Sequence, residues 1–421
     1  MRVAILDANY REPRHRSMGA LWLQWELERR RIEPVTLDDA EIALITVSSQ
    51  QGIQGVRREV RKLGKRRLPV VLGGGGAYAP AIFDPWIDVA CVGEGAHFVD
   101  VLVREGLSAA MELPEAWVPG DTRQVVPNSE FPWDIPPLNH PDGTVRLFGS
   151  RGCRYKCLFC QTGWEQLYCV NPFPATLQTR ARALETAGHR LAIVTNDGAD
   201  VDVALSGQQE FLSVRLSNLK RMMPITRAQT KSVRIGVEGV SERLRKAVGK
   251  PVSNDDLLRV TYDLAAAGVG MRWFFVPGLP CETVQDYEEL RYLVDGLRRL
   301  PKGCVMMNFH AFIPQPAAPL CVFPLVDEYW EPFEEFRRWF FHGPGFTRHC
   351  QIVAPAQYKG RMQRAQESMA AAGWELRRGW WEDDNVNWRV RYRAAPNQMR
   401  RIARRYAERL RAAENSPQFS D

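Results

Sequence analysis

This sequence has little continuous hydrophobicity. Among its 421 residues no window approaches the run of about 18 apolar residues that a membrane-spanning helix needs. Its N-terminus, MRVAILDANY, has a short apolar run but neither the long hydrophobic region nor the small-residue cleavage site of a signal peptide. These absences predict no membrane partner. We therefore expect the protein in the cytoplasm, which is the host cytoplasm if the gene is viral.

The sequence also lacks the dense, evenly spaced cysteines of a disulfide framework: its nine cysteines are an odd number and are unevenly spread. Six have no close neighbour and are predicted to be buried apolar residues: Cys91, Cys169, Cys281, Cys304, Cys321 and Cys350. The other three crowd into RGCRYKCLFC (151–160), at Cys153, Cys157 and Cys160. Three thiols at this spacing indicate metal binding.

A fourth ligand is missing from this group of cysteines. Thiolates suit zinc, copper(I) and iron–sulfur clusters, but a closed zinc site needs a fourth Cys or His at a similar spacing. His140 and His189 lie too far along the chain to supply one. A 4Fe–4S cluster held by three thiolates keeps one iron with an open position, as reactive metal sites do. The sequence therefore predicts a 4Fe–4S cluster on Cys153, Cys157 and Cys160.

The first third of the chain alternates short apolar runs with helical stretches. Four predicted strands occupy residues 3–6, 43–47, 68–74 and 89–95. Strands that alternate with helices indicate parallel βαβ units, so we expect an α/β protein in which residues 1–110 form a Rossmann-like doubly wound domain. Residues 111–144 are rich in Pro, Trp and Asp and have no periodicity, which predicts a linker.

A second βαβ series follows that linker. Its six predicted strands lie at residues 145–150, 190–197, 211–217, 232–238, 271–278 and 304–312. This series predicts a partial (β/α)6 barrel over residues 145–325, with its chemistry at the C-terminal ends of the strands. The clustered cysteines follow the first of these strands. Residues 326–421 are predicted to be a mostly helical region rich in Trp and Arg.

The cysteine motif resembles that of one enzyme superfamily. CxxxCxxC after the first strand of a βα barrel, with the aromatic Phe159 before the last cysteine, is similar to the motif of radical S-adenosylmethionine (SAM) enzymes. The resemblance implies that the open iron chelates the amino and carboxylate groups of SAM. It also implies that an electron from an external reductant, passed through the cluster, cleaves SAM to methionine and a 5′-deoxyadenosyl radical that abstracts hydrogen.

Two further strand ends resemble SAM-contacting positions of the superfamily. RIGVEGVSERLRKAVGKPVSNDDLL (234–258) is similar to the fourth-strand segment and the helix after it, with Glu238 at the strand end. Asn196, in IVTNDGAD (193–200) at the end of the second predicted barrel strand, matches by position and not by residue type. The resemblance implies that both side chains contact SAM.

The segment GVGMRWFFVPGLPCET (268–283) is similar to the fifth-strand segment, and the resemblance implies SAM contacts for Gly278 and Glu282. Cys281 stands where Gly is usual. Gly accepts a positive φ at little cost and Cys does not, so the conformation of this turn stays open. We expect Cys281 itself to be buried.

The N-terminal domain resembles that of a subgroup of radical SAM enzymes with a cobalamin-binding-like domain. VVLGGGGAYAPAIFDPWIDVACVGEGAHFVDVLV (70–103) is similar to its signature, which has a glycine-rich turn after one strand, an Asp before the next strand and a Gly-Glu-Gly turn. The resemblance implies a cobalamin-like site at Gly73 and Gly74. The Asp-x-His-x-x-Gly motif for a lower ligand is missing, since Asp7 is followed by Ala8 and Asn9. Either cobalamin binds without that ligand or the domain keeps the fold without the cofactor.

The last predicted barrel strand, in MNFHAFIPQPAAPL (307–320), also resembles this subgroup. Asn308 and His310 would face the mouth of the barrel if the strand forms. The alternative, which we favour for a single histidine, is that His310 is a hydrogen-bonded core residue.

Three functions stay open at this point. The leading one is a radical SAM isomerase, and within the subgroup the isomerisation of a glycine-modified thymine in bacteriophage DNA fits a compact member with a basic tail. A cobalamin-dependent radical SAM C-methyltransferase is the first alternative. A non-catalytic iron–sulfur or zinc binding module is the second. No pattern identifies a catalytic residue beyond the cofactor ligands.

The substrate is a small molecule or a nucleic acid. The formal charge is +7, and the densest run of arginines is the C-terminal RYRAAPNQMRRIARRYAERLRAA, which suits DNA. Trp380, Trp381 and Trp388 would then stack on bases. Residue statistics favour a simpler interpretation, in which these tryptophans pack inside the protein and the arginines line a solvated helix face.

Overall fold

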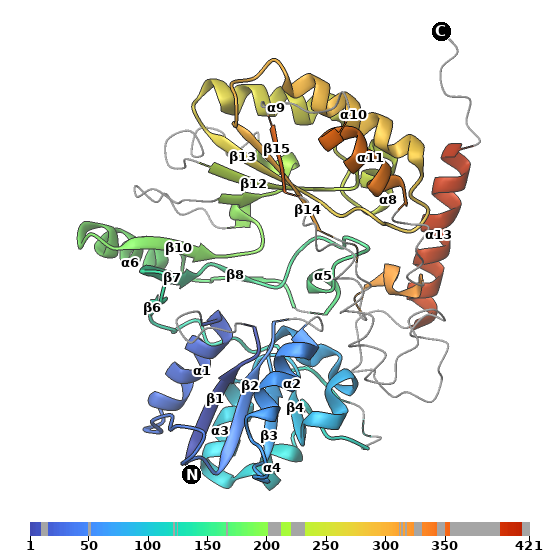
Figure 1. Ribbon diagram of the computed structural model, residues 1–421. Helices are drawn as coiled ribbons and strands as arrows, with labels where there is room; N and C mark the ends of the chain where they lie inside the picture. The colour runs from blue at the N-terminus through green and yellow to red at the C-terminus, as the bar shows by residue number, and fades with distance from the viewer. Residues whose placement is uncertain are drawn as a thin grey trace. The chain divides into compact units, whose positions relative to one another are not determined.

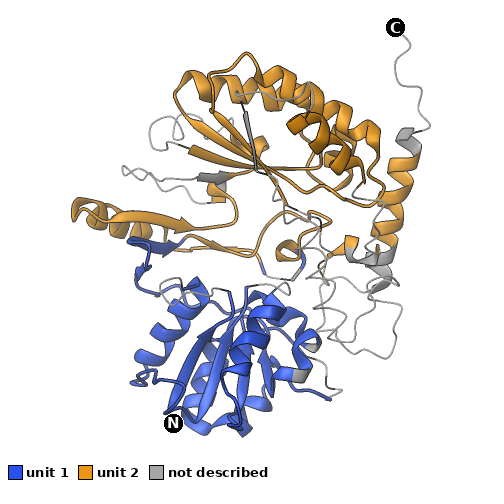
Figure 2. Cartoon of the chain, viewed as in Figure 1, with its two compact units in different colours: residues 1–148, 164–167, 364–395 blue, residues 149–163, 168–363, 396–421 orange. Residues whose placement is uncertain are grey.

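A computed structural model describes residues 1–9, 16–48, 52–120, 123, 125–165, 167–200, 212–219, 232–310, 312, 315, 318–323, 331–342, 350–353 and 396–414. The chain divides into two compact units (Figure 2). Unit 1 comprises residues 1–148, 164–167 and 364–395, and unit 2 comprises residues 149–163, 168–363 and 396–421. The boundaries predicted at residues 110, 144 and 325 remain a proposal.

Unit 1 contains a five-stranded sheet with four parallel strands and an antiparallel last strand. In spatial order the strands are β1 (Val3–Asp7), β2 (Ile42–Thr46), β3 (Val70–Gly73), β4 (Val89–Cys91) and β5 (Ala116–Trp117). The first four lie where the apolar runs predict them. Their residues, rich in Val, Ile and Leu, are buried because helices lie in front of and behind the sheet (Figure 1).

The strand order of this sheet corrects one prediction. The parallel strands follow one another in chain order from β1 to β4, so strand order does not reverse among them. A doubly wound Rossmann-like sheet has such a reversal and binds its ligand there. The α/β class with parallel strands is confirmed, but the doubly wound order is wrong. Periodicity locates strands, whereas it does not encode which edge of the sheet the next strand joins.

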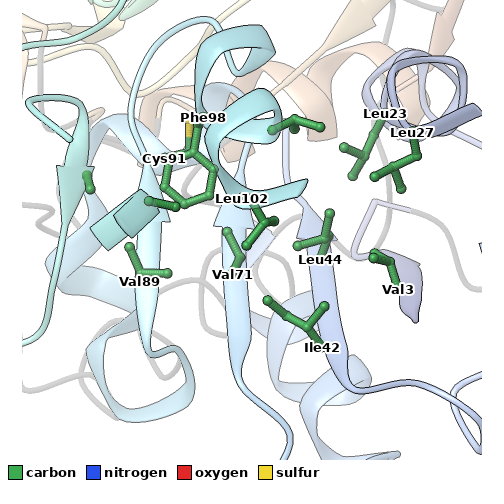
Figure 3. Packing of buried hydrophobic residues seen from close by; sticks show 13 residues of the cluster. Val3, Leu23, Leu27, Ile42, Leu44, Val71, Val89, Cys91, Phe98 and Leu102 are labelled. Carbon is green, nitrogen blue, oxygen red and sulfur yellow. The ribbon is translucent and has the colours of Figure 1, made fainter. Parts of the chain in front are cut away.

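Three helices of unit 1, α1 (Met18–Glu28), α3 (Ala96–Glu105) and α4 (Leu107–Met111), pack on its sheet through a hydrophobic cluster. The unit also contains α2 (Ile53–Arg61) and the 3-10 turns η2 (Gly75–Tyr78) and η3 (Pro80–Trp86). Figure 3 shows Leu23 and Leu27 of α1 and Phe98 of α3 in this cluster, together with Val71 of β3. Each fully buried side chain of this size contributes about 1.5–3 kcal/mol. Burial of these side chains therefore stabilises the packing of α1 and α3 on the parallel strands.

Two short strands of unit 1 lie near its C-terminal end. β6 (Leu138–Asn139) and β7 (Thr144–Phe148) pair antiparallel around a turn. The Asp142 carboxylate fixes the turn by accepting hydrogen bonds from the Thr144 N–H at 2.9 Å and from Arg146 at 2.8 Å. The segment 111–144, predicted as a linker, thus contains β5 and β6.

Unit 2 contains a five-stranded parallel sheet. In spatial order its strands are β11 (Leu212–Val214), β12 (Ser232–Glu238), β13 (Gly270–Phe275), β14 (Val305–Phe309) and β15 (Cys350–Val353). The other strands of unit 2 are the antiparallel pair β8 (Ser150–Arg151) and β9 (Cys169–Val170), and β10 (Arg190–Val194). Most predicted strand positions are therefore confirmed.

The helices of unit 2 are α6 (Pro174–Thr186), α8 (Glu242–Ala247), α9 (Asn254–Ala266), α10 (Val284–Leu297), α11 (Glu331–His342) and α13 (Pro396–Glu414), with 3-10 turns η4 (Gly198–Asp200) and η5 (Pro319–Val322). Helix α5 (Thr162–Glu165) is a single turn after the cysteines. In the described part of the chain, no helix is both long and apolar enough to cross a membrane.

The predicted six-stranded barrel is present only in part. Four of the six predicted strands, β11 to β14, lie side by side in chain order, and β15 extends their sheet. β7 and β10 form as predicted but lie outside this sheet in the residues that the structure describes. Barrel closure depends on pairing between segments far apart in the chain, which local propensity does not determine.

The central strands of the unit 2 sheet expose one face and bury the other. Val233 and Ile235 of β12 and Trp273 of β13 are fully buried. Arg234 and Glu238, which alternate with them along β12, are only partly buried. Because successive side chains of a strand point to opposite faces, the polar residues share one face of the sheet. Glu238 ends its strand on that face.

Helix α13 packs against α8 and η5 of the same unit. The Tyr406 ring is buried, and its hydroxyl donates to the Pro280 carbonyl oxygen at 2.7 Å. The opposite face of the helix is basic, with these exposed residues: Arg401, Arg404, Arg405 and Arg409. The helix is therefore amphipathic, as its arginine spacing predicts.

Candidate metal centre

The three clustered cysteines lie on the loop that follows β8. The Leu158 N–H donates to the Val248 carbonyl oxygen at 3.1 Å, and the Leu158 carbonyl accepts from the Leu320 N–H at 3.0 Å. Gly249 has a φ of 84°, and a Cβ there would lie 3.9 Å from the Cys157 Cα. Glycine permits this conformation. The loop is thus pinned to the end of α8 on one side and to η5 on the other.

The three thiols are close enough for their charges to interact. Burial raises the pKa of all three, and a second cysteine of the group raises each further: Cys160 acts on Cys153, Cys153 on Cys157, and Cys157 on Cys160. Like charges disfavour one another at short range. The structure therefore brings together the three residues that the spacing predicts.

Each sulfur also has its own hydrogen-bond donor. The Tyr155 N–H faces Cys153, and the N–H and hydroxyl of Thr162 face Cys160; these contacts lower the pKa of the two thiols against the effect of burial. The Arg215 Nη1 lies 3.7 Å from the Cys157 Sγ. Donors of this kind favour the thiolate, which is the form that binds metal. The residues present therefore fit a thiolate-bound cluster.

Among the described residues, no group of three or more His, Cys, Asp or Glu side chains is arranged to hold a single metal ion. Thiolates bound to one zinc ion lie about 2.3 Å from it, whereas in a multi-iron cluster each thiolate binds a different iron.

Glu238 lies near the cysteine loop. It ends β12 with a φ of 71°, at a break in the register between β12 and β13. Its carboxylate is 2.7 Å from the Lys250 Nζ, which also donates to the Gly236 carbonyl oxygen at 2.9 Å. The charge of Glu238 contributes to the raised pKa of Cys157 and of Cys160. A charged pair thus stands beside the thiols.

Asn196 also lies beside the cysteine loop. Its amide donates to the Gly152 carbonyl oxygen at 2.6 Å, directly before Cys153. The neighbouring Thr195 hydroxyl is 2.7 Å from the Ser150 hydroxyl. These bonds join the end of β10 to the beginning of the loop. In this structure, Asn196 supports the loop backbone, while its predicted contact with SAM remains a proposal.

Gly278 and Glu282 meet in the turn between β13 and α10. The buried Glu282 carboxylate accepts hydrogen bonds from the N–H groups of Gly278 at 3.1 Å and Leu279 at 3.2 Å, and from the Tyr287 hydroxyl. Burial raises the pKa of Glu282 to about 8 although these bonds lower it. Cys281 has a φ of 65°, so the turn keeps the conformation that suits glycine.

Burial of the isolated cysteines is only partly as predicted. Cys91 is buried in unit 1. The prediction is wrong for Cys169, Cys281 and Cys304, which are partly exposed because they lie at strand edges or in turns. The other two isolated side chains, those of Cys321 and Cys350, lie outside the described part of the chain.

The predicted cobalamin-like positions lie in unit 1, at the C-terminal end of β3. Gly74 has a φ of 97°, and a Cβ there would come within 2.6 Å of the Val47 carbonyl oxygen, so only glycine fits. At Gly73, by contrast, a Cβ would meet no atom of the described residues within 4 Å. Asp7, at the end of β1, accepts a hydrogen bond from the Ser17 N–H at 2.5 Å and helps to fix the start of α1. Gly73 leaves room for a ligand edge at the strand ends.

The last barrel strand places two further predicted residues. The amide of Asn308, which is 9% exposed, donates to the Trp273 carbonyl oxygen at 3.4 Å. His310 is exposed, and its ring stacks on Phe274 with centroids 5.7 Å apart. The core interpretation of His310 is therefore wrong, because the strand ends one residue before it.

Sequence reasoning missed two charged residues that act on Cys157, namely Arg215 and Lys250. Arg215 falls inside the strand predicted at 211–217, but it follows the end of β11 at Val214. Lys250 belongs to the segment that resembles the fourth strand and its helix, and no role was predicted for it. Their position in the sequence could have identified both residues. Arg215 follows β11 and Lys250 follows α8, and each of these elements ends near the candidate site.

Comparisons with known proteins show likeness in fold only. No protein-family model matches the chain, and no curated protein sequence matches it. The solved structure of TsrM from Kitasatospora setae, a radical S-adenosylmethionine methyltransferase with tryptophan substrate and a SAM analogue bound, has a TM-score of 0.56 to this chain. The identity is 14%, over 88% of each chain.

A second solved structure is that of OxsB, a cobalamin-dependent SAM radical enzyme with aqua-cobalamin bound. It has a TM-score of 0.52 at 14% identity and covers 90% of this chain. This chain spans 63% of OxsB, which is less than two thirds of that protein. At these identities the likeness concerns architecture, and the chain shares the fold of radical SAM enzymes, including a cobalamin-dependent one.

Proposed function

We propose that this chain is a radical SAM enzyme in which Cys153, Cys157 and Cys160 hold a 4Fe–4S cluster and SAM is the cofactor. The observation that carries the proposal is the loop after β8, where three neighbouring thiols each have a donor. When bound, the cluster and SAM supply a radical that removes hydrogen from an unactivated C–H bond. The shared fold supports the same conclusion.

The chain's own residues would bind and orient these groups. We assign SAM contacts to Glu238, Asn196, Gly278 and Glu282. Glu238 and Asn196 lie beside the cysteine loop, through the effect of Glu238 on the thiols and the bond from Asn196 to Gly152. Gly278 and Glu282 form the turn after β13, one strand further along the sheet. All four follow C-terminal strand ends, where a parallel barrel gathers its chemistry.

Two reaction classes divide the proposal further. Methyl transfer through cobalamin is supported by the fold shared with a methyltransferase and a cobalamin-bound enzyme, and by the room at Gly73. It fits at least as well as the isomerase that the sequence favours. A rearrangement needs no cobalamin. The missing lower-ligand motif is compatible with either reaction, since cobalamin would then bind without a histidine.

The substrate class follows the same division. A small molecule is supported by TsrM, whose structure has tryptophan bound. A glycine-modified thymine in DNA is supported only by the exposed arginines of α13, because Trp380, Trp381 and Trp388 lie outside the described residues. We therefore propose a small-molecule substrate first and retain DNA as the second candidate.

Anaerobic reconstitution tests the function. Wild-type protein is reconstituted with iron and sulfide, then incubated with SAM and a strong reductant, with and without cobalamin. Chromatography measures 5′-deoxyadenosine and S-adenosylhomocysteine. 5′-Deoxyadenosine alone indicates radical chemistry without methyl transfer, whereas both products only with cobalamin indicate a methyltransferase. A reconstituted cluster with neither product would favour the non-catalytic binding module.

A matched pair of variants tests the cluster ligands. Cys157→Ala should lose the iron bound to the cluster and all SAM cleavage, because it removes one of three thiolates. Cys304→Ala is the control, since Cys304 is partly buried at the start of β14 and has no predicted role. Iron per chain and 5′-deoxyadenosine are measured for both. Equal iron content in the two variants would show that the ligands are assigned wrongly.

A further inference from the structure

The three thiols have unequal surroundings. Cys153 faces a backbone N–H, and Cys160 faces a backbone N–H and a hydroxyl, which are neutral donors. Cys157 instead faces the Arg215 guanidinium, whose Nη1 is 3.7 Å from its sulfur. A positive charge thus points at one of the three predicted cluster ligands.

We propose that Arg215 is a positioning residue that raises the reduction potential of the cluster by donating a charge-assisted hydrogen bond to the Cys157 sulfur. This inference rests on the proposed function. Arg215 binds neither metal nor SAM in this proposal. It acts only through Cys157.

The guanidinium is held in place by groups other than the thiol. Its Nη2 donates to the Gly249 carbonyl oxygen, and its centre lies 4.1 Å from the centroid of the Tyr155 ring. The Tyr155 hydroxyl in turn accepts from the Asn218 amide at 2.6 Å, and that amide also donates to the Asp197 carboxylate at 2.7 Å. The arginine is therefore aimed at the sulfur before any cluster binds.

Lys250 also acts on Cys157: its charge lowers the pKa of that thiol, whereas the Glu238 carboxylate, 2.7 Å from the Lys250 Nζ, raises it. Among the described residues, Arg215 makes no ion pair with a carboxylate; its contacts there are a sulfur, a carbonyl and an aromatic ring. Arg215 therefore places a positive charge in hydrogen-bond contact with the Cys157 sulfur.

The direction of the effect follows from charge. Reduction adds one electron to the cluster, and the reduced form is the more negative of the two. A cationic donor on a ligand sulfur stabilises the more negative form more strongly, and hydrogen bonds to sulfur are a recognised control of cluster potential. Removing the arginine should therefore make the cluster harder to reduce.

Two variants and a control measure this effect. Arg215→Gln removes the charge, Arg215→Lys keeps it but loses the planar contact with Tyr155, and Arg259→Gln changes the net charge equally on an exposed part of α9. Iron and sulfide per chain and circular dichroism establish assembly and folding. A redox titration, followed by the electron paramagnetic resonance of the reduced cluster, then gives each midpoint without any turnover.

At the wild-type midpoint, Arg215→Gln should have about tenfold less reduced cluster relative to oxidised, which is a shift of about 59 mV to more negative potential for one electron. Arg215→Lys should shift in the same direction by less, and Arg259→Gln should match the wild type. If Arg215→Gln holds no iron, its midpoint potential cannot be measured. The test then rests on Arg215→Lys, whose midpoint should still be more negative than that of the wild type.

Three results would overturn the inference. The first is that Arg215→Gln holds a full cluster with the wild-type midpoint potential. The second is that Arg215→Gln holds no iron and Arg215→Lys has the wild-type midpoint, and the third is that both variants lose the cluster. Failure of the proposed function looks different, because wild-type protein would then hold no redox-active cluster. The wild-type titration therefore separates the two failures before any variant is compared.

Discussion

Replacing Glu282 with Gln should remove a pH-dependent loss of local stability. Glu282 is 6% exposed, and burial raises the pKa of its carboxyl from 4.5 to about 8, against the lowering effect of its hydrogen bonds from Tyr287, Gly278 and Leu279. A raised folded-state pKa gives a definite sign. The contribution of the carboxyl is fully present below about pH 4.5 and is lost as the pH rises through about 8.

The size of the loss follows from the pKa shift of Glu282. Between the two pKa values, each pH unit changes the folding free energy by about 1.4 kcal/mol for one proton. From about pH 5 to about pH 8, the turn should therefore lose about 4 kcal/mol of stability relative to a Gln variant. Glutamine has the same shape and cannot ionise, so it keeps an oxygen for the N–H groups and removes the pH dependence.

Hydrogen exchange followed by mass spectrometry measures this locally. Peptides from the turn and α10 are compared between wild type and Glu282→Gln at each pH, so that intrinsic exchange rates cancel. Glu288→Gln is the matched control, because its side chain is 59% exposed on α10 in an ion pair with Arg291. A difference between wild type and Glu282→Gln that stays constant with pH would refute the claim that burial governs this carboxyl.

Two further substitutions test contacts within unit 2. Tyr406→Phe removes the donor to the Pro280 carbonyl oxygen and should cost about 1–3 kcal/mol, seen as faster hydrogen exchange in α13; unchanged protection would mean that the bond contributes nothing. Cys281→Val should be less stable than Cys281→Gly by about 1–2 kcal/mol, because a β-branched side chain resists a φ of 65°. Denaturant midpoints compare the two, and equal midpoints would contradict the strain argument.

Local pattern predicts most of the strands and the metal-binding loop. Strand β12 covers the same residues, 232–238, that its apolar alternation predicts. The three cysteines gather because only three and then two residues lie between them in the sequence. Both features depend on residues close together in the sequence. Hydrophobic periodicity and ligand spacing are therefore sufficient for them.

The features that sequence reasoning missed depend on distant segments. Arg215 reaches Cys157 across 58 residues of chain, and Lys250 reaches Glu238 across the end of α8. The order of strands in unit 1 and the division of the predicted barrel likewise depend on which edges meet. A single sequence specifies these contacts through packing energy, which no local pattern reports.

Backbone strain locates the candidate site independently of the cysteines. Among the described residues, three non-glycine residues have a positive φ: Arg31, Glu238 and Cys281. Two of them follow adjacent strands of unit 2, where each such residue costs about 1–3 kcal/mol. The Val276 N–H donates to the Glu238 carbonyl oxygen at 2.8 Å, and Arg243 donates to that of Cys281 at 3.1 Å.

These bonds hold both strained residues in place. Strain that surrounding contacts enforce on neighbouring strands, at the edge where a parallel sheet binds ligands, is expected of a preorganised cofactor site more than of a structural turn. The strained backbone at Glu238 and Cys281 therefore supports the proposal that SAM binds at this edge of the sheet.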